Sequence, residues 1–321
     1  MILPLLLACT GNSDSPTEPP PDEPLSRPQT VSSPQLGDAF GFSLDASGSL
    51  LVGAPEGILG RVYEVHGTAL EMVFEEEEFG AAGFSVARDS SGSPYIGAPL
   101  ADGGRGILYR DGAIFKEGTR ALGAHVQFSN GQVLVSESKA YWVNDEVLEL
   151  PNRLSSSAVW NGEWIIGSAT GPSALHQGQT TWSRKENGDL AGFAVCAANF
   201  DNDPEQELAI GAPGIGKVGL IDPGERLDQA SWFGPGHGRF GHSIACEDGL
   251  LLVGAPTYGA NLAGAAWLLE KPFEEGANDD PFHNGTPWQQ AGFAVEVSRE
   301  LFAVGAPGNA HTPGSVTLWR R

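Results

Sequence analysis

Positive charge is scarce in this sequence. Its 321 residues include 18 lysines and arginines against 40 aspartates and glutamates, which gives a formal net charge of −22. Nucleic-acid binding depends on clusters of Lys and Arg that neutralise phosphates, so this balance argues against a nucleic-acid partner. An excess of acidic groups suits a well-solvated surface and the binding of cations.

Long apolar runs and helical periodicity are also missing. Beyond the N-terminus no apolar run reaches the 18 residues that a membrane-spanning helix needs. We also find no nucleophile elbow, no Ser/His/Asp arrangement and no paired-histidine metal spacing. Instead, 44 glycines and 23 prolines punctuate the chain, which is typical of many short strands joined by tight turns.

A repeated outline organises the chain, and its fullest copy is GFAVCAANFDNDPEQELAIGAP at residues 192–213. Each copy opens with an apolar alternating run, crosses a turn, and ends a second apolar run on Gly-Ala-Pro. The first Gly of that ending, or its equivalent, recurs at Gly53, Gly97, Ser136, Gly167, Gly211, Gly254 and Gly305. The successive spacings are 44, 39, 31, 44, 43 and 51 residues, close to the period of a β-propeller blade.

Four strands are predicted in each unit from alternation and turn residues. In the first unit they cover residues 42–46, 50–54, 60–66 and 69–74; the sixth unit repeats the plan with a longer final segment. The seventh unit supplies only three strands, at 292–297, 301–306 and 315–319. We therefore predict an all-β, seven-bladed β-propeller over residues 29–321, closed by residues 29–33, which pair with 315–319 as the outer strand of the last blade. A pair of β-sandwiches would not repeat at this period.

The Phe-Gly opening and Gly-Ala-Pro ending resemble the FG-GAP repeats of the integrin-α-like propeller family. The resemblance covers residues 40–321 and includes five copies of Gly-Ala-Pro. It implies a seven-bladed propeller in which some blades carry a calcium loop between their first two strands. It also implies a non-enzymatic binding, adhesion or scaffolding role.

The loop at residues 199–207 has oxygen-bearing side chains at alternate positions, the spacing that suits the six to eight oxygens of a calcium site. The family pattern aligns with the side chains of Asn199, Asp201, Asp203 and Glu207 and with the backbone carbonyl of Glu205. One calcium ion is therefore expected, because the equivalent loops of the other units are short turns. Asn199 and Pro204 depart from the family's usual Asp and Gly, and a solvated acidic hairpin without metal is the alternative.

The N-terminal segment, residues 1–9, ends in Leu6-Leu7-Ala8-Cys9, which resembles the lipobox of bacterial lipoproteins. Acylation of Cys9 would make the protein an exported lipoprotein of the outer membrane or cell surface. Residues 10–28 are rich in proline, serine and acidic residues and are predicted to form a disordered tether. The apolar run is short and lacks a preceding Lys or Arg, so an ordinary apolar start with an incidental cysteine is the alternative.

Further expectations concern the cysteines, the histidines and the partner. Cys196 and Cys246 occupy repeat positions that differ by one residue, which places their side chains on opposite faces of the pleat, so we expect free thiols. His125 and His242 fall near the start of first strands, where a side chain could face the central channel. We expect a monomer that contacts the membrane only through its lipid and binds an unknown protein or glycan. The alternative function is an extracellular enzyme, or an accessory domain of one, acting on glycans or lipids.

Overall fold

The computed structural model describes residues 27–321, except 58, 145, 151–154, 169–173, 178–179, 184–187, 202, 248 and 271–279. The expected lipobox with Cys9, and residues 10–26 of the expected tether, lie outside the described residues.

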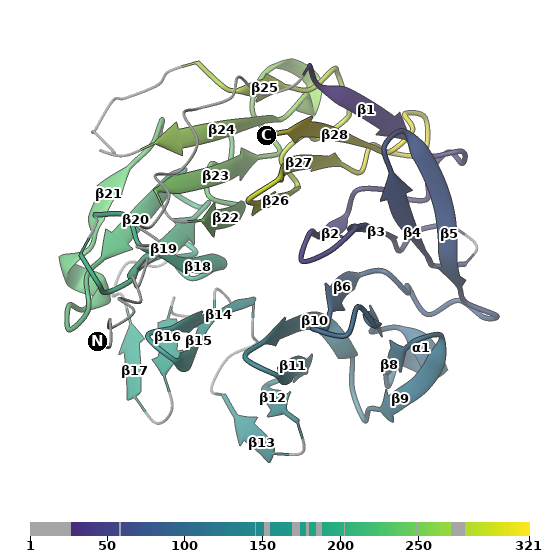
Figure 1. Cartoon of the computed structure of the whole chain (residues 1–321), viewed down its shortest axis with the longest axis horizontal. Helices are drawn as coiled ribbons and strands as arrows, with labels where there is room; N and C mark the ends of the chain where they lie inside the picture. Colours follow the sequence, from purple (N-terminus) through teal and green to yellow (C-terminus); the bar gives the residue numbers. More distant parts are fainter. Residues whose placement is uncertain are drawn as a thin grey trace, which may run out of the picture.

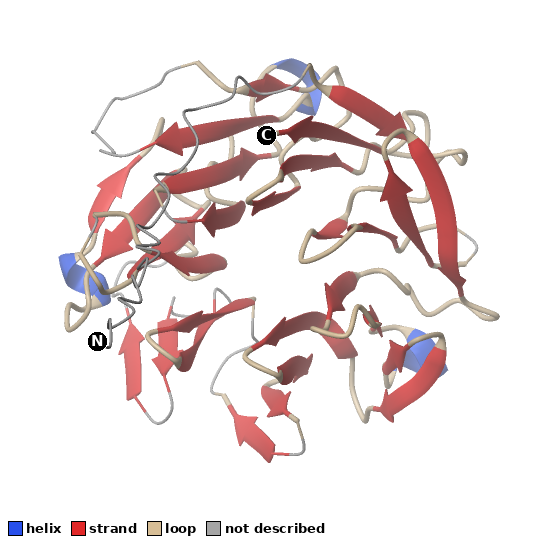
Figure 2. Cartoon of the chain, viewed as in Figure 1, coloured by secondary structure: helices blue, strands red, loops and turns tan. Residues whose placement is uncertain are grey.

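The described part of the chain forms seven antiparallel sheets of four strands each, arranged in a ring (Figure 1). Strands account for nearly all of its regular structure (Figure 2). The predicted all-β, seven-bladed β-propeller is therefore confirmed. Three short helices, α1 (Ala101–Gly104), η1 (Leu227–Gln229) and η2 (Ala260–Leu262), lie in connections between strands. Among the described residues no helix is both long and apolar enough to cross a membrane.

The first four blades follow the chain in order. Blade 1 contains β2 (Ser43–Asp45), β3 (Leu50–Ala54), β4 (Arg61–His66) and β5 (Ala69–Glu75). Blade 2 contains β6 (Ser85–Arg88), β7 (Pro94–Ala98), β8 (Ile107–Arg110) and β9 (Ala113–Glu117). Blade 3 contains β10 (Leu122–Ser129), β11 (Gln132–Glu137), β12 (Ala140–Val143) and β13 (Glu146–Glu149). Blade 4 contains β14 (Ser156–Trp160), β15 (Glu163–Ser168), β16 (Ala174–Gln177) and β17 (Thr180–Ser183).

The last three blades complete the ring. Blade 5 contains β18 (Ala194–Ala198), β19 (Glu207–Ala212), β20 (Lys217–Ile221) and β21 (Ser231–Phe233). Blade 6 contains β22 (Ser243–Glu247), β23 (Leu250–Ala255), β24 (Ala265–Glu270) and the two-residue β25 (His283–Asn284). Blade 7 contains β26 (Ala294–Ser298), β27 (Leu301–Ala306), β28 (Ser315–Arg320) and the N-terminal β1 (Gln29–Ser32).

The two faces of the disc carry different connections. The first strand of each blade lies innermost, around the central channel (Figure 1). Because the four strands of a blade alternate in direction, loops after the first and third strands emerge together on one face, here called the hairpin face. Loops after the second and fourth strands emerge on the opposite face, here called the entry face, where the chain enters each innermost strand.

Packing between blades explains the alternating apolar residues. The seven hydrophobic clusters each lie between two neighbouring blades. In β3, for example, Leu50 and Val52 face blade 7, whereas Leu51 faces blade 2. Alternate side chains of a strand therefore pack against the two neighbouring blades, because each strand is buried on both sides.

The Gly of Gly-Ala-Pro is required by the backbone of the next blade. A Cβ placed on Gly53 would lie 2.0 Å from the carbonyl oxygen of Gly83 in blade 2, which no real side chain could tolerate. The same approach recurs at Gly97, Gly167, Gly211, Gly254 and Gly305, each against the carbonyl of a glycine in the following blade. A serine hydroxyl often reinforces it, as where Ser43 Oγ donates to the Gly83 carbonyl at 2.8 Å. The repeated motif is thus the point of closest contact between blades.

Blades 3 and 4 meet differently. Here Ser136 replaces the glycine, and its hydroxyl accepts a hydrogen bond from the backbone N–H of His125 at 2.8 Å. The His125 ring contacts Ser157 Oγ at 2.8 Å, and Ser157 donates to Gln127. A polar group therefore occupies the inner part of this seam, and the apolar cluster beside it has only four fully buried members, Leu134, Tyr141, Leu150 and Ile166.

The ring is closed by the pairing of the two ends of the described chain. β1 pairs antiparallel with β28, with Val31 opposite Val316 and Ser32 opposite Ser315. The backbone N–H of Ser33 extends the ladder by donating to Gly314 at 2.9 Å. Val31 is buried in the cluster between blades 7 and 1. The predicted closure of blade 7 by residues 29–33 is therefore confirmed.

The expectation of free thiols at Cys196 and Cys246 is wrong. The two sulfurs are bonded, and their Cα atoms lie 6.0 Å apart, within the usual range for a disulfide. The two cysteines do point to opposite faces of their own sheets. Neighbouring blades, however, pack face against face, so opposite faces of β18 and β22 are the ones that meet.

Candidate functional site

The acidic loop of blade 5 connects β18 to β19 on the hairpin face. Three side chains in succession each accept a hydrogen bond from the backbone N–H two residues further on. Asn199 Oδ1 accepts from Asp201 at 3.3 Å, Asp201 Oδ1 from Asp203 at 3.0 Å, and Asp203 Oδ1 from Glu205 at 2.8 Å. The loop therefore coils around its own side-chain oxygens.

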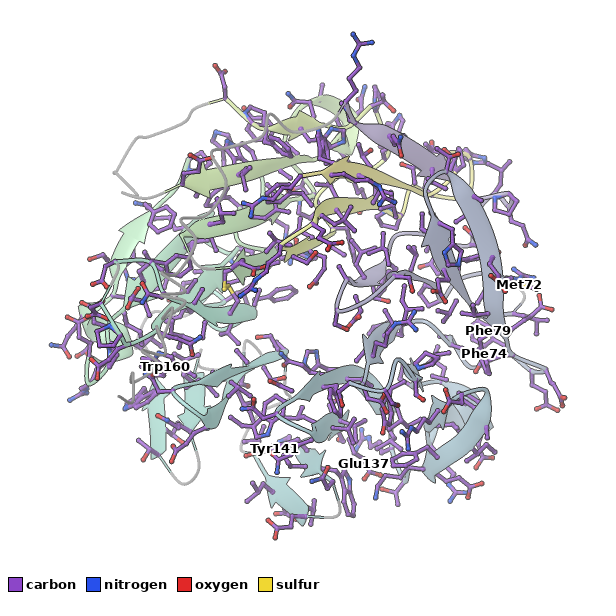
Figure 3. All side chains as sticks on the ribbon, viewed as in Figure 1. Met72, Phe74, Phe79, Glu137, Tyr141 and Trp160 are labelled. Carbon is purple, nitrogen blue, oxygen red and sulfur yellow. A yellow bond between two sulfur atoms is a disulfide. The ribbon has the colours of Figure 1, made fainter. Side chains whose placement is uncertain are left out.

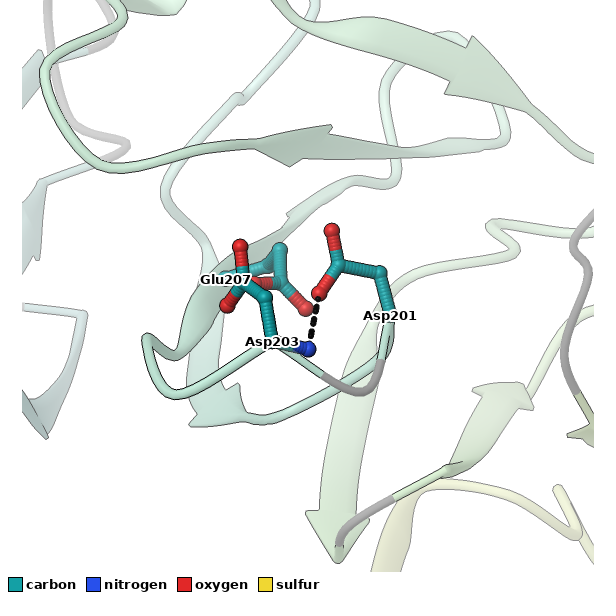
Figure 4. A group of neighbouring side chains, drawn as sticks. All are labelled: Asp201, Asp203 and Glu207. Atoms are coloured by element: carbon teal, nitrogen blue, oxygen red, sulfur yellow. Dashed lines mark hydrogen bonds between the residues drawn. The ribbon is translucent and has the colours of Figure 1, made fainter.

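Three carboxylates of this loop converge, as Figure 4 shows for Asp201, Asp203 and Glu207. One oxygen from each lies within 4.8 Å of the other two, and no other such group occurs among the residues that the structure describes. Asp201 and Asp203 are exposed, whereas Glu207 is buried and accepts a hydrogen bond from the Phe200 N–H. Two exposed carboxylates thus face a buried one, and each of the three accepts a hydrogen bond from the backbone.

The other two expected ligands are the Asn199 side chain and the backbone carbonyl of Glu205. The Asn199 side chain joins the loop by donating to the Asp203 carbonyl and accepting from the Asp201 N–H. Glu205 lies in the exposed part of the same loop, and its backbone N–H donates to Asp203. Pro204 has no left-handed backbone, and neither do its neighbours Asp203 and Glu205. The donor set is made of oxygens alone, which suits a hard divalent cation such as calcium. The three carboxylates give this donor set its negative charge.

The equivalent loop of blade 2 has fewer acidic residues and is arranged differently. Asp89 accepts hydrogen bonds from Ser91 and Ser93, and Arg110 Nη2 lies 2.6 Å from its second oxygen. Burial tends to raise the pKa of Asp89, but these hydrogen bonds outweigh it and lower the pKa. A guanidinium of the same blade therefore balances this carboxylate, whereas three carboxylates accumulate in blade 5.

An aromatic collar surrounds part of the channel mouth on the entry face, and our sequence reasoning missed it. Its rings belong to five blades and occupy one repeat position, directly after the glycine that precedes each innermost strand: Phe84, Phe42, Phe293, His242 and Phe193. Successive ring centroids lie 4.8, 4.7, 4.9 and 4.8 Å apart. The recurring Gly-Phe dipeptide was the available signal. Blades 3 and 4 carry Ala124 and Ser155 there instead, so the collar is an open arc.

The collar carries no charge of its own at neutral pH. Burial, with a smaller contribution from the positive charge of Arg239, lowers the pKa of His242 to about 4. The ring nitrogen Nδ1 lies 3.2 Å from the Phe293 carbonyl, which fixes the ring orientation. Arg239 lies 5.7 Å from the centroid of Phe193, so one end of the arc already receives a guanidinium.

Exposed apolar side chains also gather on the entry face. Six exposed large apolar residues lie in its loops or at its channel mouth: Leu36, Phe79, Phe84, Leu100, Leu262 and Trp288. The other five lie on outer strands at the rim: Met72, Ile114, Phe115, Val147 and Leu148. Figure 3 shows Met72 and Phe79 at the outer part of the disc. Among the described residues, the loops of the hairpin face carry none.

The two histidines expected near the channel lie in different places. His242 belongs to the collar, whereas His125 lies in the seam between blades 3 and 4, where burial lowers its pKa to about 4. Its contact with Ser157 does not resemble a nucleophile and its base. The Ser157 hydroxyl donates to Gln127, so its oxygen accepts from His125, and the side chain is 5% exposed.

Comparisons with known proteins add no family assignment. No protein-family model matches the chain, and a search of curated proteins also gave no match.

Proposed function

We propose that this chain is a non-enzymatic binding and scaffolding propeller of the FG-GAP, integrin-α-like type, which docks a basic protein on its entry face. The observation that carries the proposal is the number of exposed apolar groups on that face, around an arc of aromatic rings in tilted contact. Six large apolar side chains exposed on one face support an interaction surface there, because large exposed apolar patches are uncommon on monomeric proteins.

The chemistry of the collar favours a cationic side chain of the partner. Ring faces attract Lys and Arg, and the neutral His242 adds no opposing charge. The net charge of −22 attracts a basic partner from a distance and speeds its association. Phe84, with 37% of its surface exposed, is the most accessible ring of the arc and forms its end on the blade 2 side.

Calcium has a structural role in this proposal. Asp201, Asp203 and Glu207 would hold one ion, with Asn199 and the Glu205 carbonyl as further oxygen donors. The bound ion would offset most of the charge of three carboxylates and fix the loop that joins β18 to β19. Because a ligand that binds only the folded state stabilises it, calcium would strengthen blade 5 without taking part in catalysis.

The proposal also includes a lipid anchor at the N-terminal segment. Acylation at Cys9 and a tether at residues 10–28 would hold the propeller at the outer membrane or cell surface and leave both faces accessible. Metabolic labelling with a fatty-acid analogue should mark the wild type and not Cys9→Ala. Equal labelling of the two would remove the anchor from the proposal.

The docking face is tested with matched surface variants. The double variant Phe79→Ser/Phe84→Ser alters the entry face, and Ile114→Ser/Phe115→Ser alters as much exposed apolar surface at the rim. Tagged proteins would be used to capture partners from the source cell envelope, quantified by mass spectrometry. A basic protein lost with the first variant and retained with the second supports the proposal. Equal capture by all three proteins contradicts it.

A further inference from the structure

A cavity of about 210 Å³ opens on the hairpin face between blades 4 and 5, away from the collar. Its walls come from three places: the end of β14, the strands β16 and β17, and the loop after β20. Trp160 at the end of β14 lies on the blade 5 side of its blade, as Figure 3 shows. The cavity is thus built by two blades together, and neither blade contains it alone.

The aromatic wall is rigid. Trp160 is buried, with 3% of its surface exposed, and Trp182 is half-buried beside it. The two rings meet edge to face, with centroids 6.3 Å apart and planes at 76°. The Trp160 indole N–H donates to the Gln206 carbonyl at 2.6 Å, so the acidic loop of blade 5 fixes this ring. Trp182 therefore presents a flat apolar surface on a firm support.

Polar side chains surround the aromatic wall and are held by second contacts. Gln177 Nε2 donates to Glu163 at 2.8 Å, and Asn161 Oδ1 accepts from the Gln206 N–H at 3.4 Å. Glu225 accepts a hydrogen bond from the Asp222 N–H at 3.1 Å. Arg226 adds a guanidinium, which lies 3.4 Å from Asp228. The cavity thus offers amide, carboxylate and guanidinium groups, a mixture of donors and acceptors.

We propose that this cavity binds one neutral pyranose ring of a glycan. A sugar ring has an apolar face that packs on an indole, and hydroxyl groups that pair with amide and carboxylate groups. The cavity is smaller than the roughly 300–1,000 Å³ of pockets for drug-sized ligands, which fits a single ring. The carboxylate of Glu225 lies beside the guanidinium of Arg226, which Asp228 already pairs, so the cavity has no excess positive charge for a phosphorylated or acidic ligand. The site lies on the opposite face from the proposed protein-docking surface and does not depend on it.

The test uses the whole protein and a panel of neutral monosaccharides: glucose, galactose, mannose and N-acetylglucosamine. Binding is measured by saturation-transfer NMR and by tryptophan fluorescence. At least one sugar should bind in the millimolar range, and Trp182→Ala should weaken it about tenfold or more. Trp182→Phe should retain part of the affinity, because it keeps an aromatic surface. The control Trp288→Ala removes an exposed indole from the entry face and should bind as the wild type does.

Two results would overturn the proposal. One is that no sugar of the panel binds the wild type. The other is that binding survives Trp182→Ala or is lost equally in Trp288→Ala. If Trp182→Ala fails to fold, the loop variants Glu225→Ala and Arg226→Ala decide instead, and undiminished binding by both contradicts the site. Loss of sugar binding with normal partner capture separates this site from the entry face.

Discussion

Cys196 of β18 and Cys246 of β22 form a disulfide between the innermost strands of blades 5 and 6. Their repeat positions differ by one residue, since Cys196 pairs with Ala209 and Cys246 with Leu251 in their sheets. In one flat sheet that offset would keep two side chains apart. Between two blades packed face to face, the same offset brings them together. The bond adds a covalent link where the other seams rely on packing.

Removing this disulfide should destabilise the propeller. The bond closes a loop between residues 50 apart, for which a loss of about 2–4 kcal/mol in the free energy of unfolding is typical. Denaturant unfolding of the wild type with and without reductant, and of Cys196→Ala/Cys246→Ala, measures it. Thiol alkylation of a Cys9→Ser background provides the control, because native protein should show no free thiol. Rapid alkylation of both cysteines would contradict the bond.

The closing strand should be essential to stability. Deleting residues 10–26 should leave the unfolding midpoint unchanged, whereas extending the deletion through Ser33 removes β1 and exposes the edge of β28. The point variant Val31→Ala removes two buried methyl groups and should cost about 1.5–2.5 kcal/mol. Ser32→Ala, at an exposed position of the same strand, should cost much less. Equal midpoints for the two deletions would mean that the ring closes without β1.

Calcium should raise the melting temperature if the acidic loop binds it. At a concentration about 100 times the dissociation constant, a ligand of the folded state adds roughly 2.7 kcal/mol. Asp201→Asn and Asp203→Asn should abolish the gain. Asp89→Asn in blade 2 should keep it, although that variant loses the ion pair with Arg110. A wild-type melting temperature that responds to neither calcium nor chelator would leave the loop a metal-free acidic hairpin.

The seam between blades 3 and 4 should make stability depend on pH. Burial lowers the pKa of His125 from 6.5 to about 4, so between these values the unfolded chain binds more protons than the folded one. Stability should therefore fall as the pH falls from 6.5 towards 4, and this contribution should fall no further below pH 4. The difference between wild type and His125→Gln in denaturant unfolding isolates the effect from the carboxyl groups. Parallel pH profiles would assign the acid sensitivity elsewhere.

Much of the fold could be predicted because one steric requirement recurs along the sequence. Where the carbonyl of Gly83 approaches Gly53, no side chain fits, so glycine recurs at six of the seven contacts between blades and reveals the blade period. Strand ends followed from the turns, and the predicted strands at 50–54, 250–255 and 301–306 agree with β3, β23 and β27. The missing fourth strand of the last unit pointed to the N-terminal segment.

The sites depend on contacts between blades, which a repeat pattern does not reveal. The acidic loop was visible because its ligands are adjacent in sequence. The collar was missed because Phe42 and Phe293 are far apart in the chain and meet only when the ring closes. The cavity beside Trp182 needs the turn at Glu225 from another blade. The alternation of side chains along each strand correctly predicted the sheet face to which each cysteine points. It did not predict which residue of the neighbouring blade each cysteine would contact.

The pairing of β1 with β28 also sets the order of events during synthesis. β1 is translated before the other described strands and its partner β28 after them, so blade 7 stays incomplete until β28 has emerged. Until then the apolar cluster between blades 7 and 1 cannot assemble, because it needs Val316 and Leu318 of β28, and unpaired strand edges are open to aggregation. The disulfide between blades 5 and 6 spans strands that emerge earlier and can form first. Maturation therefore ends with a single late event, the joining of the first strand to the last.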